Sequence, residues 1–206
     1  MVQIMKRVLI ITVILLLALS HTLQGQTPET LFDDDIRHGG YWAPVYGATS
    51  INGQFAYLRG SRWAWVINFR GEHSVNLGMG RYRTYTSFDP VDWNIQDVEE
   101  PDLKTRYRGF ELEYVNQTYR LFHFSAHTLV GSGTVRYDNG ADELDKTSDQ
   151  YFVLQPAASL NLNVTRWFRL TGSAAYRYVG DLNLEGTSGS DLGGFLGFVG
   201  LRFGKF

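Results

Sequence analysis

The sequence predicts an all-β chain that folds as an eight-stranded antiparallel up-and-down transmembrane β-barrel. Three observations indicate this fold class. Apolar and polar residues alternate with a period of two in successive aromatic and β-branched segments. Tight turns and long loops alternate between these segments, and one face of the segments is almost wholly apolar. No convincing helix pattern occurs after residue 38.

Composition limits the class of protein before any element is placed. The chain has 206 residues, a formal net charge of -2 and 15% aromatic residues, which suits one folded domain and argues against a nucleic-acid-binding surface. The absence of cysteine excludes a disulfide scaffold and a lipoprotein anchor. No glycine-rich phosphate loop or metal-ligand spacing occurs, so we predict neither a cofactor nor a metal.

The first 25 residues have the order of a secretory signal peptide. Lys6 and Arg7 precede an apolar run from Val8 to Leu19, and a polar stretch follows. A membrane anchor is the alternative, but the run is shorter than the roughly 20 residues that a spanning helix needs. We therefore predict a signal peptide at 1–25, a flexible polar leader at 26–38 and the barrel domain at 39–206.

Eight segments of alternating pattern follow the leader. The tight turns at 68–73, 116–119 and 163–166 each join two of them, and Asn52–Gly53 marks another short turn. An even number of strands places both ends of the domain on one side. The predicted strands are 40–49, 55–68, 73–87, 106–115, 120–136, 150–163, 166–179 and 193–205.

Long connections gather at the other end of these strands, at 88–105, 136–149 and 180–191. Short turns at one end and long loops at the other are typical of an outer-membrane barrel, whose loops lie outside the cell. The first two loops are acidic and could meet an extracellular partner, although the segment from Asp138 to Glu143 lacks the full spacing of a calcium loop. Their acids are Asp89, Asp92, Asp97, Glu99, Glu100 and Asp102, then Asp138, Asp142, Glu143, Asp145 and Asp149.

The apolar face has the length of a membrane crossing. From Phe168 to Tyr178 every second residue is apolar, and at roughly 3.3 Å per residue and a tilt near 40° the row spans about 25 Å along the membrane normal. Trp167, Tyr176 and Tyr178 fit aromatic girdles at the membrane surfaces. A soluble lipocalin-like barrel, with its apolar face inside, is the alternative. The opposite face favours the membrane, because it carries small polar residues rather than dense lysine and glutamate.

The last strand ends in a phenylalanine, Phe206. This end resembles the signal by which Gram-negative outer-membrane barrels are passed to their assembly machinery, and the resemblance implies that Phe206 is recognised there. Gly204 and Arg202 occupy positions where the signal usually has apolar residues in phase with the last one. A β-bulge would restore the usual phase.

Residues from about 40 to 206 resemble the small eight-stranded outer-membrane barrels of the OmpA and OmpX type. The likeness rests on three segments, 109–114, 129–133 and 163–170. It implies a place in the cell outer membrane, in contact with outer-membrane lipids and lipopolysaccharide. Such barrels share architecture more than activity, so the role predicted is a structural, envelope or surface-interaction role.

The lumen of an eight-stranded barrel is only wide enough for side chains. Since a buried charge without a partner is very costly, we predict a packed structural charge network rather than a pore. The pairing of acids with bases stays open. The residues of this network are Arg62, Glu111, Glu113, Arg169, Arg177 and Arg202.

One constellation has a catalytic alternative. His123 and Ser125, with His127, resemble the arrangement in outer-membrane lipid A deacylases, which implies a serine nucleophile and a histidine base. Ala126 replaces that family's asparagine, and the strand pattern sends His123 and Ser125 inward near the periplasmic end. We therefore predict that the chain is not an enzyme, with a lipid A-modifying hydrolase as the alternative.

Overall fold

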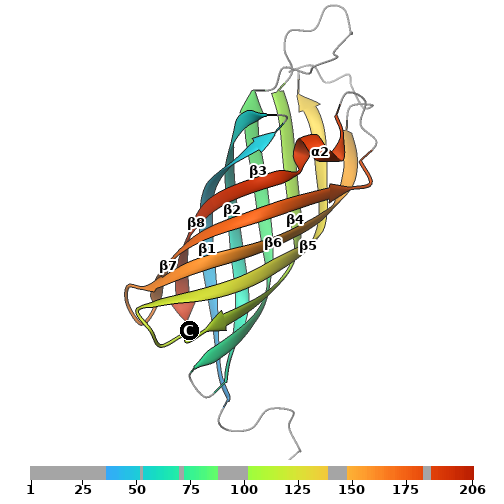
Figure 1. Cartoon of the computed structure of the whole chain (residues 1–206). Helices are drawn as coiled ribbons and strands as arrows, with labels where there is room; N and C mark the ends of the chain where they lie inside the picture. Colours follow the sequence, from blue (N-terminus) through green and yellow to red (C-terminus); the bar gives the residue numbers. More distant parts are fainter. Residues whose placement is uncertain (1–35, 52, 70–71, 88–101, 139–147, 183–186) are drawn as a thin grey trace, which may run out of the picture. The chain divides into compact units, whose positions relative to one another are not determined.

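The structure, a computed structural model, describes residues 36–51, 53–69, 72–87, 102–138, 148–182 and 187–206. These residues form a closed barrel in which each of eight antiparallel strands pairs with the next and β8 pairs with β1 (Figure 1). The fold class predicted from the sequence is confirmed. The predicted signal peptide and most of the leader lie outside the described residues.

The strands lie close to their predicted positions, and β3 has the predicted bounds. β4 begins before its predicted start, and β1 begins at Ile36, so that residues 36–38, assigned above to the leader, pair with β2. The bounds are β1 Ile36–Ile51, β2 Gln54–Phe69, β3 His73–Ser87, β4 Asp102–Asn116, β5 Phe122–Asp138, β6 Ser148–Asn163, β7 Phe168–Gly180 and β8 Gly194–Lys205.

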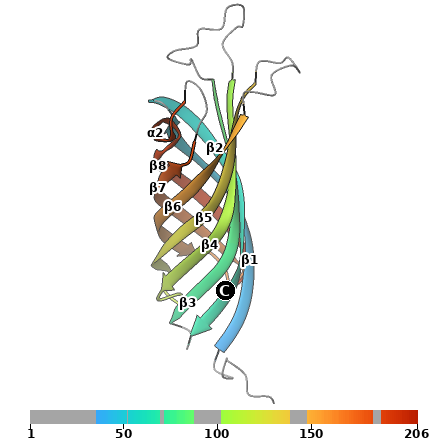
Figure 2. The same ribbon diagram turned by 90° about the vertical axis from the view of Figure 1, so that its right-hand side faces the viewer.

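Tight turns connect the strands at the end of the barrel that the sequence pattern assigns to the periplasm. The amide of Glu72 donates to the carbonyl of Phe69, and the amide of Arg120 donates to the carbonyl of Gln117, which has a positive φ of 51°. Figures 1 and 2 show these turns at the lower end of the barrel. At the other end, residues 88–101 and 139–147 fall outside the described residues, and most of the predicted acidic loop positions lie there.

A short helix, α2 (Gly189–Leu192), occupies part of the predicted loop at 180–191 and was not predicted. The amide of Ser188 donates to the Asp191 carboxylate, and this contact stabilises the first turn. Leu192 is buried in the core at the loop end of the lumen. No helix among the described residues has both the length and the apolar character needed to cross a membrane.

The outer surface of the barrel is apolar, as the strand pattern predicts. Phe110 and Phe195 are 73% and 79% exposed, whereas Glu113 and Arg202, on the other face of their strands, are buried. Large apolar side chains therefore face outward, and both glutamates of β4 and the arginine of β8 face inward. This arrangement is the reverse of a lipocalin-like barrel and suits a barrel surrounded by lipid.

The lumen has two layers. The half nearer the tight turns holds the buried ion pairs described below. The half nearer the loops is an apolar core, with Leu58, Leu103, Leu129 and Val153 fully buried and Leu192 of α2 packed against them. The sequence pattern indicates small polar residues on the inner face, and it did not predict the apolar layer of the upper half.

Candidate functional site

Glu113 is the centre of the charge network in the lumen. Its carboxylate accepts two hydrogen bonds from the Arg202 guanidinium, at 3.0 and 2.8 Å, one from Ser125 Oγ at 2.8 Å and one from Asn76 Nδ2 at 2.9 Å. Tyr41 donates a longer bond of 3.2 Å. All five side chains are buried. The bidentate arginine contact is the strong form of this interaction, and it compensates for removing the carboxylate from water.

Glu111 lies beside Glu113 on β4 and has its own partners. Arg62 Nε approaches its carboxylate at 2.5 Å, and Tyr82 donates a hydrogen bond of 2.7 Å. Arg62 Nη2 also lies 3.9 Å from the Glu113 carboxylate, so the two ion pairs form one connected network. β2, β4 and β8 supply its charges, and these strands meet only because the barrel closes.

The two other predicted members of the network lie elsewhere. The Arg169 guanidinium sits 4.0 Å from the centre of the Phe206 ring, and Phe206 stacks on Tyr41 at 5.9 Å. Arg177 donates through Nε to the carbonyl of Leu192 at 2.7 Å, and its guanidinium lies over the Tyr107 ring. The structure thus brings together Arg62, Glu111, Glu113 and Arg202, and places Arg169 and Arg177 apart from the glutamates.

Phe206 faces the lumen rather than the lipid. β8 keeps one register with β7 from Arg177 to Phe168, and no bulge interrupts it, so the bulge suggested from the sequence is absent there. Phe206 therefore stays in phase with Arg202. The outward aromatic near the end of β8 is Phe203, which stacks on Phe168 at 4.9 Å.

The His123 and Ser125 pair is buried and its geometry differs from that of a nucleophile and its base. Ser125 donates its hydroxyl hydrogen to Glu113 and accepts from Asn161 at 2.9 Å. His123 Nδ1 lies 3.1 Å from the carbonyl of Arg120. Among the described residues no hydrogen bond joins His123 to Ser125, and no group of three or more acidic, histidine or cysteine side chains could hold a metal ion.

A second site lies on the outer wall and was missed from the sequence. Arginines and one lysine of β2, β3, β4 and β5 point outward near the loop end, on the same strand faces as the apolar residues. We call this group the arginine belt. Its members are Arg59, Arg81, Arg83, Lys104, Arg106, Arg108 and Arg136.

The register places basic side chains of the belt directly opposite one another. Arg59 faces Arg83 across β2 and β3, Arg83 faces Arg106 across β3 and β4, and Lys104 faces Arg136 across β4 and β5. Arg81 likewise faces Arg108. Directly opposed like charges destabilise a sheet, so the belt is an unfavourable arrangement for the isolated barrel.

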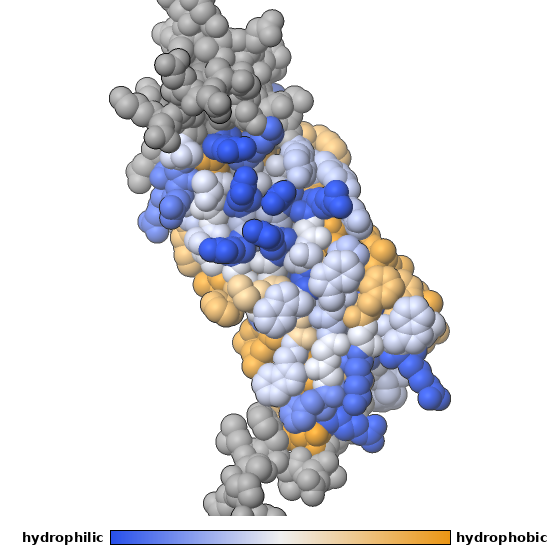
Figure 3. Space-filling model, turned by 180° about the vertical axis from the view of Figure 1, so that it is seen from behind, coloured by the Kyte–Doolittle hydropathy of each residue, from blue (hydrophilic) through white to orange (hydrophobic). Residues whose placement is uncertain are grey.

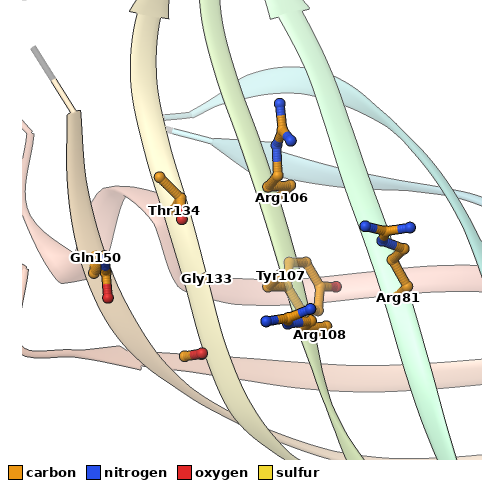
Figure 4. A pocket seen from close by; sticks show the side chains of 8 residues that line it. Arg81, Arg106, Tyr107, Arg108, Gly133, Thr134 and Gln150 are labelled. Atoms are coloured by element: carbon orange, nitrogen blue, oxygen red, sulfur yellow. The ribbon is translucent and has the colours of Figure 1, made fainter. Parts of the chain in front are cut away.

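The surface of the belt is hollowed. One hollow of about 300 Å³ is lined by Arg81, Arg106 and Arg108 together with Ser132, Thr134 and Gln150. Figure 4 shows the three arginines on neighbouring strands around it. Two further hollows continue along the belt on either side. Figure 3 shows hydrophilic residues gathered on the upper part of this face, with hydrophobic residues below them.

The sequence does contain a signal for the belt. Arg81–Tyr82–Arg83 and Arg106–Tyr107–Arg108 repeat one pattern, and Arg108 has the same parity as Phe110 and Leu112. Once that parity is fixed, the arginines of both patterns are predicted to face outward. The sequence alone does not show that β3 and β4 align the two patterns side by side.

Solved structures resemble this barrel, although no protein-family model and no curated protein matches the sequence. The attachment invasion locus protein Ail of Yersinia pestis, in complex with the heparin analogue sucrose octasulfate, is 13% identical, with a TM-score of 0.52 over 81% of this chain and 96% of Ail. Neisserial surface protein A is 14% identical, with a TM-score of 0.47 over 83% and 95% of the two chains. The N-terminal β-barrel domain of Pseudomonas aeruginosa OprF is 16% identical, with a TM-score of 0.43 over 80% and 96%.

These matches concern the fold. The match to Ail, with its TM-score of 0.52, confirms the resemblance in fold to small outer-membrane barrels that the sequence suggests. The outward-facing apolar side chains agree with this fold.

Proposed function

We propose that this chain is a non-conducting, non-enzymatic barrel that supports the integrity of the outer membrane and offers a surface for interactions outside the cell. The observation that carries the proposal is the filled lumen. Phe206 packs on Tyr41 at the periplasmic end, the Glu111 and Glu113 network follows, and Leu192 packs into the apolar core at the loop end. A barrel filled in this way supplies a rigid wall rather than a path for solutes.

Planar bilayer recordings test the first part of the proposal. The purified full chain should give no single-channel steps at moderate voltages, because buried side chains occupy both layers of the lumen. Reproducible conductance steps from heat-modifiable, folded protein would contradict a non-conducting role.

A gene deletion tests the envelope role and the enzymatic alternative together. Loss of the chain from its host should increase uptake of a hydrophobic dye, and the wild-type chain should restore the barrier. Ser125→Ala should restore it equally wherever heat-modifiable gel migration shows a folded barrel. If the folded Ser125→Ala barrel failed to restore the barrier while the wild type did so, the hydrolase alternative would gain support.

The interaction surface for an extracellular partner is proposed to lie in the acidic loops. Their clustered carboxylates favour a basic partner, because opposite charges speed and orient association. Cells that display the chain with Asp142→Asn, Glu143→Gln and Asp145→Asn should attach less well to basic extracellular-matrix proteins. Equal attachment at equal surface levels would remove this part of the proposal.

Assembly supplies a further partner. We propose that the barrel assembly machinery recognises Phe206 before the barrel closes, even though the ring faces the lumen afterwards. Phe206→Ala should lower the amount of folded chain in the outer membrane more than Phe203→Ala does. The reverse order would assign recognition to the outward row that contains Phe203.

A further inference from the structure

We propose that the arginine belt binds the phosphate groups of a phosphorylated glycolipid in the outer leaflet of the membrane. The inference deepens the proposed function and rests on it, because it names the lipid partner through which the barrel would stabilise the envelope.

The basic side chains of the belt repel one another across neighbouring strands. Cross-strand neighbours have Cβ atoms about 4.5 to 5.5 Å apart, and the belt fills successive positions of this kind with like charges. Lipid-facing side chains bring no packing benefit that requires arginine. A bound anion turns each opposed pair from a repulsive contact into two attractive ones.

Five arginines of the belt lack counter-charges on the described outer face of the wall. Of the ion pairs and hydrogen bonds formed by described residues, none involves Arg81, Arg83, Arg106, Arg108 or Arg136. Glu111 and Glu113 belong to the same sheet but point into the lumen. Among residues of β2 to β5 whose side chains the structure describes, no carboxylate lies on the outer face. These five arginines therefore have no counter-charge on the described outer face of the wall, and anions from outside the wall would supply one.

The position of the belt on the wall favours a lipid as the source of those anions. Arg108 lies two residues from Phe110 on the same outward face, so the belt borders the apolar band and points sideways rather than toward bulk water. From Arg108 to Lys104 the belt covers roughly 13 Å of strand, or about 10 Å along the membrane normal after tilt. The headgroup layer of a bilayer is roughly 5 to 8 Å deep on each side, so the belt spans this layer and extends beyond it. A lipid headgroup reaches this surface directly, whereas a soluble polyanion must displace lipid first.

The hydrogen-bond donors of the belt suit a phosphate group. Guanidinium groups present paired N–H donors that match phosphate oxygens, and all but one of the belt cations are arginine. In the hollow of Figure 4, Ser132, Thr134 and Gln150 add neutral donors beside Arg81, Arg106 and Arg108. Arginine side chains with neutral hydrogen-bond donors between them suit a sugar phosphate, because the sugar hydroxyl groups also require hydrogen-bond partners.

Native mass spectrometry of the full chain in neutral detergent tests the proposal. The probes are bis-phosphorylated lipid A, lipid A with the same acyl chains and no phosphate, and inositol hexakisphosphate as a soluble polyanion. The test variant is Arg81→Gln with Arg108→Gln. The matched control is Arg120→Gln with Arg166→Gln, which removes two exposed arginines at the tight-turn end.

The wild type and the control should bind phosphorylated lipid A equally, and more tightly than the phosphate-free lipid. The belt variant should lose about fivefold in affinity per arginine, roughly 25-fold in total. Thermal unfolding supplies a second readout. Without lipid A the belt variant should melt higher than the wild type, because repulsion is relieved, and lipid A should then raise its melting temperature less.

Several results would overturn the inference. Unchanged binding by a folded belt variant would do so, as would equal loss in the control or equal binding of phosphate-free lipid A. Inositol hexakisphosphate that binds as tightly as lipid A would make the belt a site for soluble polyanions. Failure of the proposed function would give a different result, because the protein would then fractionate outside the outer membrane.

Discussion

Glu113 offers the sharpest test of how the lumen is held together. Glu113→Gln keeps the size of the side chain but removes the charge that compensates the buried Arg202. It also replaces one acceptor oxygen by an NH₂ group, which meets donors from Arg202, Ser125 or Asn76. Breaking a buried pair on one side costs about 3 to 5 kcal/mol. The upper half of that range is expected because a donor–donor contact accompanies the lost charge.

The assay is equilibrium unfolding in guanidinium chloride from phospholipid vesicles, followed by the fluorescence of the five tryptophans. Glu72→Gln is the matched control, since its side chain is 66% exposed and its removal should change stability very little. The double variant Glu113→Met with Arg202→Met should be less destabilised than Glu113→Gln, because it leaves no unpaired charge. A cost below about 1 kcal/mol for Glu113→Gln would refute the reasoning.

Three further substitutions test separate parts of the fold. Ala174→Arg, on the outward face of β7, should lower the free energy of unfolding in a bilayer by about 2 to 4 kcal/mol. Ala175→Arg should instead lower the yield of folded barrel, because the larger side chain crowds the lumen. Equal tolerance of both variants in vesicle refolding would refute the assignment of outward and inward faces on β7. Gly131→Ala should impair refolding, since its Cβ would meet the backbone oxygen of Arg108, while Gly172→Ala should be tolerated because nothing lies within 4 Å of its Cβ; similar refolding yields would contradict this. Tyr41→Phe should lower the free energy of unfolding by about 0.5 to 1.5 kcal/mol, because it removes a hydrogen bond to Glu113. Tyr46 is exposed, so Tyr46→Phe should change this free energy very little. A chemical denaturation experiment that ranks the two variants in the opposite order would be inconsistent with the network.

Strand number, parity and turn positions follow from the sequence because they depend on local rules. The period of two fixes which residues share a face, and turn residues such as Asn116 and Asn163 fix where each strand ends. Once the lipid-facing side of one strand is known, the lipid-facing sides of the neighbouring strands follow from their pairing with it. The outward position of Phe110 and the inward position of Glu111 could therefore be predicted.

The pairing of charges could not be predicted, because it depends on contacts across the closed barrel. Arg202 reaches Glu113 from β8, far away in sequence, and only barrel closure and stagger determine that Arg202 rather than Arg169 does so. α2 escaped prediction for a similar reason. It is a four-residue helix whose Leu192 is held in the lumen by tertiary contacts, and the carbonyl of Leu192 accepts from Arg177.

The inward phase of Phe206 is the instructive difference at the C-terminus. The apolar row Val199, Leu201 and Phe203 already identifies the lipid face of β8, and Phe206 lies out of phase with it. A rule that places the last residue in phase with the lipid-facing row predicts that Phe206 faces the lipid. The parity of the whole strand predicts the observed one.

The central claim is that lipid surrounds the barrel and that side chains fill its lumen. Because the chain has no cysteine, single cysteines at Ala174 and Ala175 can carry nitroxide labels without background. Electron paramagnetic resonance in vesicles then compares collisions with oxygen, which concentrates in lipid, and with a water-soluble nickel chelate. We expect the label at 174 to be accessible to oxygen and not to nickel, and the label at 175 to be protected from both. A label at 174 that is accessible to nickel, or one at 175 that collides freely with oxygen, would contradict the account.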